Sequence, residues 1–290
     1  MRLLRPQSVA EAIRLADEGG EESKVIAGGT ALMLMMRNGL LDPDPLIALD
    51  RVPGLSYIDA GDDVVRLGAL TTLRRLQRAP ELVHVLPTLA ASLGLVANHR
   101  VRRRATIGGN LSEADYASDP PAVLITLGCR VRISGPGAER ELPLSEFLVD
   151  FYETALAPNE IVTEVLVPRP PSTARTIYLK YVSRSAEDRP CVGVAAYLDR
   201  DESGRCREVR IAVSGATATP FTLTEVTGGV RGAPVDARVW DDVAEAYSAA
   251  ISPIGDGRGS AGYRKHVTGQ LIRRALGEIT GDGENGARRL

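Results

Sequence analysis

The sequence has few of the residues that build metal and redox-cluster sites. Its three cysteines, Cys129, Cys191 and Cys206, lie far apart and form no CxxC pair. This spacing excludes a cysteine-based zinc site or an iron–sulfur cluster held by this chain alone. The three histidines have no neighbouring ligand residues at metal spacing, so we interpret them as structural or surface residues. They are His84, His99 and His266.

The sequence also has few aromatic residues and almost no net charge. Aromatics make up 4% of the 290 residues, so any aromatic site must be small. The 35 Lys and Arg residues nearly balance the 37 Asp and Glu residues, and no basic excess predicts binding to nucleic acid. No segment reaches the roughly 18 apolar residues of a membrane span, and the N-terminus lacks a signal-peptide core. We therefore expect a cytoplasmic protein with reduced thiols.

The residues that are present alternate between helical and strand patterns. Ser8 followed by Glu11 has capping-box spacing and predicts a helix that ends at Gly19–Gly20. Thr71 is a candidate cap for a later short helix. The strands expected at 55–59 and 64–70 resemble a hairpin that turns at residues 61–63. The other elements expected in the first half are strands at 24–27 and 46–49, helices at 30–37 and 87–98, and a helix-to-strand passage over 122–134.

A polar interval at residues 167–176, VPRPPSTART, contains three prolines and no apolar periodicity, which is typical of a linker. After it we expect strands at 177–182, 192–198 and 208–214, with a DESG turn before the last strand. Helices are expected at 237–251 and 260–279, the second capped by Ser260. A sheet followed by helices predicts an α+β domain.

One glycine pattern fits a dinucleotide-binding motif only formally. Gly281–Gly286 reads GDGENG, but no expected strand precedes it and no expected helix follows it. We interpret this polar segment as a disordered tail. The chain also has no Walker-type GK[ST], no G-x-S-x-G and no H-E-x-x-H, so these nucleotide and hydrolase templates fail.

Two other glycine pairs share one layout. Val25–Leu32 reads VIAGGTAL and Ala105–Leu111 reads ATIGGNL. Such a pair marks either a turn with positive φ or a place where another group approaches the backbone closely. Backbone N–H groups of a glycine-rich turn that opens a helix can also bind a pyrophosphate. The pattern leaves open whether the pairs hold a nucleotide cofactor or only make tight turns.

Polar residues near both pairs would suit a nucleotide. Thr30 and Asn110 could add side-chain donors, and Asp115, Ser118 and Asp119 could accept hydrogen bonds from ribityl or ribose hydroxyls. A run of arginines directly before the second pair either forms a solvated face or meets a phosphate or a partner subunit. This run consists of Arg100, Arg102, Arg103 and Arg104.

The two glycine pairs and the position of Asp119, nine residues after Asn110, resemble the FAD-binding medium subunits of molybdenum hydroxylases. This group includes the carbon monoxide dehydrogenase medium chain and the flavin domain of xanthine dehydrogenase. Four further segments are similar, so the resemblance covers nearly the whole chain. They are GDDVVRLGALTTL at 61–73, LAPNEIVTEV at 156–165, LKYVSRSAEDRPCVGVAA at 179–196 and YRKHVTGQLIRRAL at 263–276.

The resemblance implies an α+β fold in two domains. Residues 1–170 would form a FAD-binding domain of the vanillyl-alcohol-oxidase (PCMH) type, with two subdomains at about 1–55 and 56–170. Residues 175–280 would form a smaller α+β domain of sheet and helices that helps to cover the flavin. A flexible tail at 281–290 would follow.

The same resemblance implies a set of cofactor-binding residues. In the family both glycine motifs hold the FAD pyrophosphate, and the aspartate at the Asp119 position bonds the cofactor's hydroxyls. Two positions depart from many relatives: Thr30 stands where they have His or Asp, and Asp115–Tyr116 stands where they have Ser-Pro or Asp-Pro. The implied residues are Val25, Ile26, Ala27, Gly28, Gly29, Thr30, Ala31, Leu32, Val96, Thr106, Ile107, Gly108, Gly109, Asn110, Asp115, Asp119, Ile161 and Lys180.

By this resemblance the chain is an FAD-binding electron-transfer subunit of a molybdenum hydroxylase. A large molybdenum-cofactor subunit would oxidise the substrate, a small [2Fe-2S] subunit would pass single electrons on, and FAD would deliver them to NAD+, a quinone or another acceptor. A dimer of such heterotrimers is the expected assembly. The flavin carries the redox chemistry, so we assign no catalytic acid or base to this chain, and a place for Lys180 near the ring is a hypothesis.

Two alternatives to this function have features against them. A stand-alone FAD-dependent oxidoreductase would need its own substrate pocket, and the sequence shows no obvious catalytic His or Tyr cluster. A flavin-free assembly subunit would not need the intact AGGT and TIGGN motifs.

Overall fold

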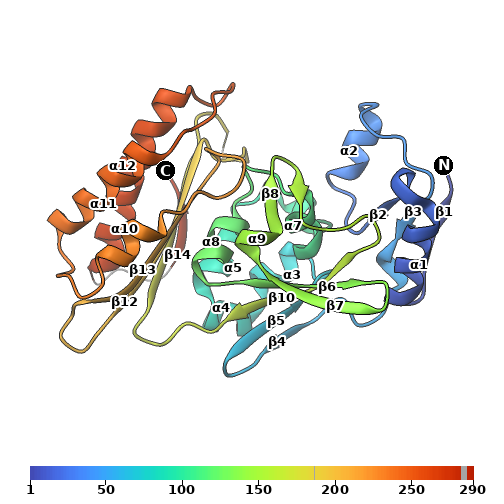
Figure 1. Ribbon diagram of the computed structural model, residues 1–290, viewed down its shortest axis with the longest axis horizontal. Coiled ribbons are helices and arrows are strands. Elements are labelled where there is room, and N and C mark those ends of the chain that lie inside the picture. The colour runs from blue at the N-terminus through green and yellow to red at the C-terminus, as the bar shows by residue number, and fades with distance from the viewer. Residues whose placement is uncertain (186, 282–285) are drawn as a thin grey trace. The chain divides into compact units, whose positions relative to one another are not determined.

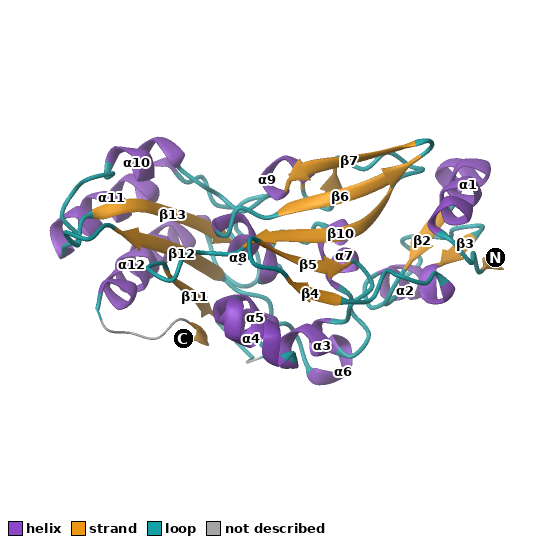
Figure 2. Cartoon of the chain, turned by 90° about the horizontal axis from the view of Figure 1, so that it is seen from below, coloured by secondary structure: helices purple, strands orange, loops and turns teal. Residues whose placement is uncertain are grey.

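The computed structural model describes residues 1–185, 187–281 and 286–290. The chain forms two compact units, each assembled from three separate segments (Figure 1, Figure 2). Unit 1 comprises residues 1–76, 98–115 and 129–168, and unit 2 comprises residues 77–97, 116–128 and 169–290. Both units mix helices and strands, which confirms the predicted α+β class.

The N-terminal part of unit 1 is a three-stranded parallel sheet, in the order β1-β3-β2, with two short helices. The predicted cap at Ser8 is present, because the Ser8 hydroxyl accepts the N–H of Glu11 at 3.1 Å. The Glu11 carboxylate accepts the N–H of Gln7, one residue before the N-cap, at 2.7 Å. The elements are β1 (Leu3–Leu4), α1 (Val9–Gly19), β2 (Lys24–Ile26), α2 (Leu32–Arg37) and β3 (Leu46–Ala48), with single 3₁₀ turns at Gly20–Glu22 and Leu49–Arg51.

A five-stranded antiparallel sheet, in the order β4-β5-β10-β6-β7, forms most of the rest of unit 1. Its first hairpin, β4 (Ile58–Ala60) and β5 (Val64–Gly68), turns at the predicted place. The other strands are β6 (Arg130–Gly135), β7 (Ala138–Pro143), β10 (Ile161–Pro168) and the small pair β8 (Leu148–Asp150) and β9 (Glu153–Thr154). The helices are α3 (Leu73–Arg78, whose last two residues belong to unit 2), α6 (His99–Arg102), α7 (Ile107–Glu113) and α9 (Leu144–Phe147).

The cap of α3 differs from the prediction by one residue. The Thr71 hydroxyl donates to the Tyr57 carbonyl at 2.9 Å, and it is the Thr72 hydroxyl that accepts the N–H of Arg75, at 3.3 Å. The prediction that Thr71 caps this helix is therefore wrong. Two adjacent threonines are equivalent in a capping pattern, and only the contact with the distant Tyr57 distinguishes them.

Unit 2 is built on a four-stranded sheet in the order β13-β12-β11-β14. The strands β11 (Arg175–Tyr181), β12 (Val192–Arg200) and β13 (Cys206–Ser214) form the predicted antiparallel meander. The fourth strand, β14 (Gly286–Arg289), runs parallel to β11, where the sequence predicts a flexible tail. The formal glycine motif at 281–286 falls mostly on residues 282–285, which lie outside the described residues.

Helices cover both faces of this sheet, as Figure 1 shows: α11 and α12 pack on one face, and α5 and α8 on the other. The period of two along β11 explains the arrangement, because Leu179 joins the apolar core beneath α11 and α12 whereas Tyr178 and Lys180 point to the opposite face. Ser260 caps α12 as predicted and accepts the N–H of Tyr263 at 3.2 Å. The helices are α4 (Pro80–Val85), α5 (Pro87–Leu93), α8 (Pro120–Thr126), α10 (Thr224–Gly229), α11 (Ala237–Ala250) and α12 (Ala261–Thr280).

One helix predicted in the first half of the chain is shorter than expected, and some segments of this half cluster with unit 2. The helix predicted at 87–98 ends at Leu93, and Asn98 instead caps α6, where its side chain accepts the N–H groups of Arg100 and Val101. Residues 77–97 and 116–128 lie within the predicted first domain, 1–170, and by their contacts they cluster with unit 2. They supply the second helical layer on its sheet, a requirement that local sequence patterns do not reveal. The domain limits of 1–170 and 175–280 stay a prediction.

Candidate cofactor site

The first glycine motif, Val25–Leu32, connects β2 to α2 in unit 1. The N–H of Met33 donates to the Gly29 carbonyl at 3.2 Å, and the N–H of Leu34 donates to the Ala31 carbonyl at 2.9 Å. Within the described part of the chain, the backbone N–H groups of residues 28–32 donate no hydrogen bond. The loop and the start of α2 therefore present a set of unsatisfied donors, which suits an anion.

Geometry requires both glycines of this motif. A side chain at Gly28 would place its Cβ 2.7 Å from the Arg104 carbonyl carbon and 3.0 Å from the Ala105 Cα, so only glycine allows the two segments to approach. Gly29 has a φ of +72°, in the left-handed region that side chains other than glycine rarely adopt. The first pair is therefore both a turn and a close contact.

The second glycine motif, Thr106–Asn110, lies in the first turn of α7 and not in a turn with positive φ. Thr106 is the N-cap of this helix. All four N–H groups that follow it donate hydrogen bonds within the protein, and a contact of this motif with the cofactor stays a prediction. Ile107 donates to the Thr71 carbonyl (3.0 Å), Gly108 to the Ala69 carbonyl (2.9 Å), Gly109 to the Thr106 hydroxyl (3.1 Å) and Asn110 to the Thr106 carbonyl (2.9 Å).

Close packing explains the glycines of the second motif. A Cβ at Gly108 would lie 2.6 Å from the Cβ of Ala69 and 2.9 Å from its carbonyl oxygen. A Cβ at Gly109 would lie 2.8 Å from the Thr106 hydroxyl and 3.7 Å from the Cβ of Ala27. Together with the contact of the first motif described above, this places the two motifs side by side in unit 1.

The arginine run before the second motif is largely solvated. Arg100, Arg103 and Arg104 are exposed, and none of them forms an ion pair within the described residues. Arg102 is half-buried and has interaction partners. The exposed positions agree with the interpretation as a solvated face, and contact with a phosphate or a partner subunit stays a prediction.

Two predicted cofactor residues, Asp119 and Lys180, form a buried ion pair in unit 2. The Lys180 ammonium donates to the Asp119 carboxylate at 2.8 Å and to the Leu95 carbonyl at 2.9 Å. The Tyr178 hydroxyl donates to the other Asp119 oxygen at 2.7 Å. Asp119 is 3% exposed and Lys180 is fully buried. The pair is therefore well satisfied inside the unit.

Burial dominates the electrostatics of this cluster. Desolvation raises the pKa of Asp119 to about 6, although the charge and hydrogen bond of Lys180 oppose the shift. Burial and the neighbouring carboxylate raise the pKa of Tyr178 well above its usual value. Tyr178 was not among the predicted residues. Its signal in the sequence is its spacing of two from Lys180, which places both side chains on one face of β11.

The remaining predicted residues lie in other surroundings. Ile161 begins β10 and is 4% exposed within the apolar core of unit 1. Val96 and Asp115 are half-buried and have interaction partners. Tyr116, at the position that departs from many relatives, donates its hydroxyl to Asp256 at 2.7 Å. Contacts of these residues with a cofactor stay predictions.

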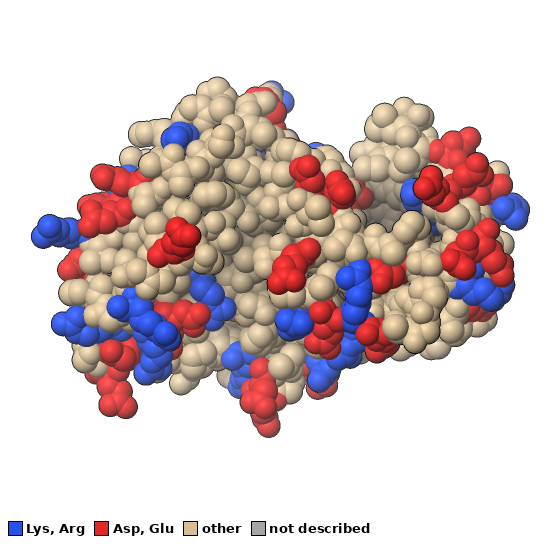
Figure 3. Space-filling model, in the orientation of Figure 1, with Lys and Arg blue, Asp and Glu red and all other residues tan. Residues whose placement is uncertain are grey.

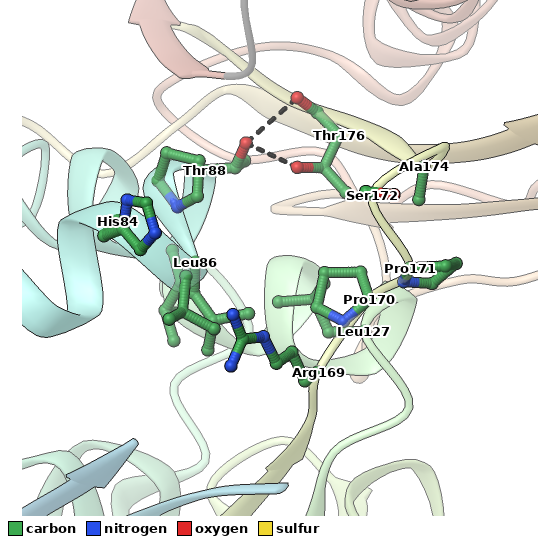
Figure 4. A pocket seen from close by; sticks show the side chains of 13 residues that line it. His84, Leu86, Thr88, Leu127, Arg169, Pro170, Pro171, Ser172, Ala174 and Thr176 are labelled. Atoms are coloured by element: carbon green, nitrogen blue, oxygen red, sulfur yellow. Dashed lines mark hydrogen bonds between the residues drawn. The ribbon is translucent and has the colours of Figure 1, made fainter. Parts of the chain in front are cut away.

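A pocket of about 230 Å³ lies elsewhere in unit 2, between the start of α5 and the segment 169–176 (Figure 4). The Thr88 hydroxyl bonds the carbonyl of Thr176 at 2.9 Å and shares a hydrogen bond with its hydroxyl at 2.7 Å. His84 and Arg169 also line the pocket. None of the predicted cofactor residues lines it.

Two family models match this chain, one in its N-terminal part and one in its C-terminal part. Residues 1–170 match the FAD binding domain in molybdopterin dehydrogenase, and residues 177–279 match the CO dehydrogenase flavoprotein C-terminal domain. The chain therefore belongs to the family of FAD-binding medium subunits of molybdopterin dehydrogenases.

Individual relatives align almost end to end. The chain is 33% identical over 272 residues to the 6-hydroxypseudooxynicotine dehydrogenase complex subunit alpha of Paenarthrobacter nicotinovorans, covering 93% of this chain and 90% of the relative. It is 31% identical over 273 residues to the carbon monoxide dehydrogenase medium chain of Afipia carboxidovorans, covering 94% of each. The structure of carbon monoxide dehydrogenase from Hydrogenophaga pseudoflava matches with a TM-score of 0.92 at 30% identity, covering 96% of each chain.

These matches confirm the resemblance stated from the motifs, the α+β fold and FAD as the cofactor. The first glycine motif fits that cofactor, because its unsatisfied N–H groups suit a pyrophosphate and a side chain at Gly28 or Gly29 is sterically disfavoured. Among the described helices, none is long and apolar enough to cross a membrane.

Proposed function

We propose that this chain binds the pyrophosphate of FAD with its first glycine motif and transfers electrons inside a molybdenum hydroxylase complex. It would receive electrons from a [2Fe-2S] subunit and pass them to NAD+, a quinone or another acceptor, while a large molybdenum-cofactor subunit oxidises the substrate. The observation that carries this proposal is the set of unsatisfied N–H groups at residues 28–32, directly beside the second glycine motif.

Residues 28–32 suit the pyrophosphate for two physical reasons. Several N–H groups that point out of one short loop form a concave set of donors, and donors of this kind stabilise phosphate oxygens without a lysine. The side chain of Thr30 is exposed at this loop and adds a hydroxyl. The absence of side chains at Gly28 and Gly29 lets the phosphate approach the backbone.

The second motif has a supporting role in this proposal. The N–H groups of Ile107 and Gly108 already hold α7 against the segment that follows β5. Because Gly28 packs against the backbone of Arg104 and Ala105, this braced segment fixes the position of the first motif. Gly109 is exposed, so the cofactor can also pass close to the surface of α7.

In this proposal Asp119 and Lys180 act from within their buried ion pair. Each oxygen of Asp119 already accepts one hydrogen bond, and an ionised carboxylate has about four acceptor positions. A cofactor hydroxyl would therefore use the acceptor positions that Tyr178 and Lys180 leave. Lys180 fixes Asp119 and the Leu95 carbonyl against β11, which makes it a positioning residue.

FAD, when bound, supplies the exchange between one-electron and two-electron carriers. The chain's residues hold the cofactor and set its surroundings, and no side chain needs to act as an acid or a base. We further propose a dimer of heterotrimers as the assembly. A cytoplasmic location is also proposed, because the three cysteines are free and buried thiols.

The substitution Gly28→Ala tests the proposal. The new Cβ would press on the Arg104 carbonyl group and push the two motifs apart, at a cost of about 1–3 kcal/mol. We expect FAD affinity to fall by roughly tenfold or more, measured by flavin absorbance after purification, with and without partner subunits, and by titration with FAD.

Gly277→Ala in α12 is the matched control. Nothing lies within 4 Å of a Cβ at this position. We expect it to keep its FAD and to gain about 0.5–1 kcal/mol of stability. Full FAD occupancy in Gly28→Ala would show that the pair only shapes the loop, and a wild-type chain that holds no FAD in any assembly would support the flavin-free alternative.

A further inference from the structure

The C-terminal residues of the chain form an edge strand of the sheet in unit 2. β14 pairs in parallel with β11 (Figure 2), and the N–H of Leu290 donates to the Lys180 carbonyl at 2.8 Å. The match to the C-terminal family model ends at residue 279, so this strand lies outside it. β14 is therefore an addition to the part of the fold that the family model describes.

The register of β14 decides which face of the sheet each of its side chains occupies. Arg289 lies opposite Lys180. The preceding residue, Arg288, lies opposite Leu179. Residues paired in this way share a face, and successive residues alternate between faces. Arg288 accordingly pairs with Glu278 of α12, the helix that covers Leu179. Arg289 therefore lies on the opposite, polar face, together with Lys180.

Arg289 brings a second positive charge to the buried Asp119 cluster. Burial raises the pKa of Asp119, and the charges of Lys180 and Arg289 oppose this shift, so the guanidinium lies within electrostatic reach of the carboxylate. The Tyr178 hydroxyl stays neutral, because burial and the carboxylate raise its pKa. The cluster therefore holds two cations and one carboxylate.

The guanidinium of Arg289 also has an unused donor. Its Nε is buried and has no hydrogen-bond partner within the described residues. A buried donor of this kind gains a hydrogen bond when a ligand supplies an acceptor. In Figure 3, Lys and Arg side chains mix with Asp and Glu over the visible surface, as is usual for solvated arginines. The extra charge and the unused donor of Arg289 indicate a bound anion instead.

We propose that Arg289 is a further cofactor-binding residue of this chain and donates to a phosphate oxygen of FAD. This inference rests on the proposed function, in which Asp119 accepts hydrogen bonds from the cofactor's hydroxyls. The ribityl and ribose hydroxyls of FAD are a few bonds away from its pyrophosphate, so a cation beside Asp119 suits a phosphate oxygen. A guanidinium matches phosphate oxygens in charge and in geometry. Arg289 would add this charge to the N–H donors of the first glycine motif.

Arg289→Met tests this proposal, with Arg288→Met as the matched control. Both variants remove one positive charge from the same strand, but Arg288 lies on the other face and pairs with Glu278. Each full-length chain, with any partner subunits that copurify, is freed of flavin and titrated with FAD at several salt concentrations. A third variant, Arg289→Lys, keeps the charge and loses the planar group of donors.

We expect Arg289→Met to bind FAD roughly tenfold more weakly than the wild type, and Arg288→Met to bind it like the wild type. Arg289→Lys should restore part of the lost affinity. The affinity of the wild type should also fall more steeply with salt than that of Arg289→Met, because salt screens the attraction between the guanidinium and a phosphate. A purely structural role of Arg289 would leave this salt dependence unchanged.

Three results separate this inference from the proposed function. Equal FAD affinity, or an equal salt dependence, in Arg289→Met and the wild type would overturn the inference and leave the proposed function intact. Equal losses of affinity in Arg289→Met and Arg288→Met would also overturn it, because the strand would then act only as a support for the sheet. A wild-type chain that binds FAD in no assembly would overturn the proposed function itself.

Discussion

The two glycine motifs of unit 1 have nearly the same sequence layout and opposite hydrogen-bonding states. In the first, the N–H groups of residues 28–32 donate no hydrogen bond within the described chain. In the second, the N–H groups of Ile107, Gly108, Gly109 and Asn110 are all satisfied by the protein. A glycine pair therefore has two separate uses here: one leaves donors open, and the other lets a helix pack closely.

This difference assigns different tasks to the motifs. An open set of donors has a physical reason to bind a ligand, because unsatisfied N–H groups gain a partner when an anion arrives. A satisfied set has no such reason, and its substitution should act first on the fold. The buried Asp119–Lys180 pair of unit 2 belongs with the satisfied group.

The largest effect is expected for Gly108→Val. Its branched side chain would overlap Ala69, both Cβ and carbonyl oxygen, so the N-terminus of α7 would have to move. Overpacking of this kind costs about 3 kcal/mol. We expect a lower free energy of unfolding in denaturant and loss of FAD as a consequence. A variant with wild-type stability that fails to bind FAD would instead give the second motif a direct role in binding.

The second-largest expected effect is a pH dependence of the free energy of unfolding, which arises from Asp119. Its pKa is raised to about 6 in the folded chain, against roughly 3.9 in an unfolded one. The folded state therefore holds this proton more tightly, and the resulting stabilisation is complete below about pH 4 and lost as pH rises through about 6. Relative to Asp119→Asn, the free energy of unfolding of the wild type should fall by up to about 3 kcal/mol between pH 4 and 7.

Asp119→Asn leaves the Lys180 ammonium buried without its carboxylate partner, which lowers the stability of this reference variant. The double variant Asp119→Asn/Lys180→Met removes both charges and serves as a second reference. Parallel stability curves of the wild type and both references over this pH range would contradict the raised pKa. Such a result would mean that the contacts of Asp119 with Lys180 and Tyr178 fully offset the cost of burying its charge.

The smallest effect is expected for Thr30→Ala. The Thr30 side chain is exposed and makes no hydrogen bond within the described residues, so stability should change by less than about 0.5 kcal/mol. FAD affinity should fall by about fivefold, from loss of one hydroxyl donor, and titration with FAD would measure it. A marked loss of stability would show that the first motif also supports the fold.

Much of the fold follows from local sequence signals. The caps at Ser8 and Ser260 and the turns of the β4–β5 and β12–β13 hairpins depend on residues within a few positions of each other, and the sequence predicts all of them. Both glycine motifs were also located from their sequences. The state of their N–H groups was not predictable, because it depends on the carbonyls of Ala69 and Thr71, which lie far from Gly108 in the sequence.

The Asp119 cluster shows the same limit in unit 2. The resemblance singled out Asp119 and Lys180, but their mutual contact depends on the packing of the start of α8 against β11. Tyr178 was missed because a tyrosine within a strand is common in any core. Long-range pairing of this kind is set by tertiary structure, which a single sequence does not display.

Both units are assembled from three alternating segments, so the chain crosses between them five times. A fragment cut at the 167–176 linker would carry the sheet of unit 2 without α5 and α8, and Tyr178 and Lys180 would lose their partners on that face. A C-terminal fragment that begins at this linker would therefore expose the polar face of its sheet. During synthesis, the polar face of this sheet can be completed only with helices that left the ribosome long before its strands.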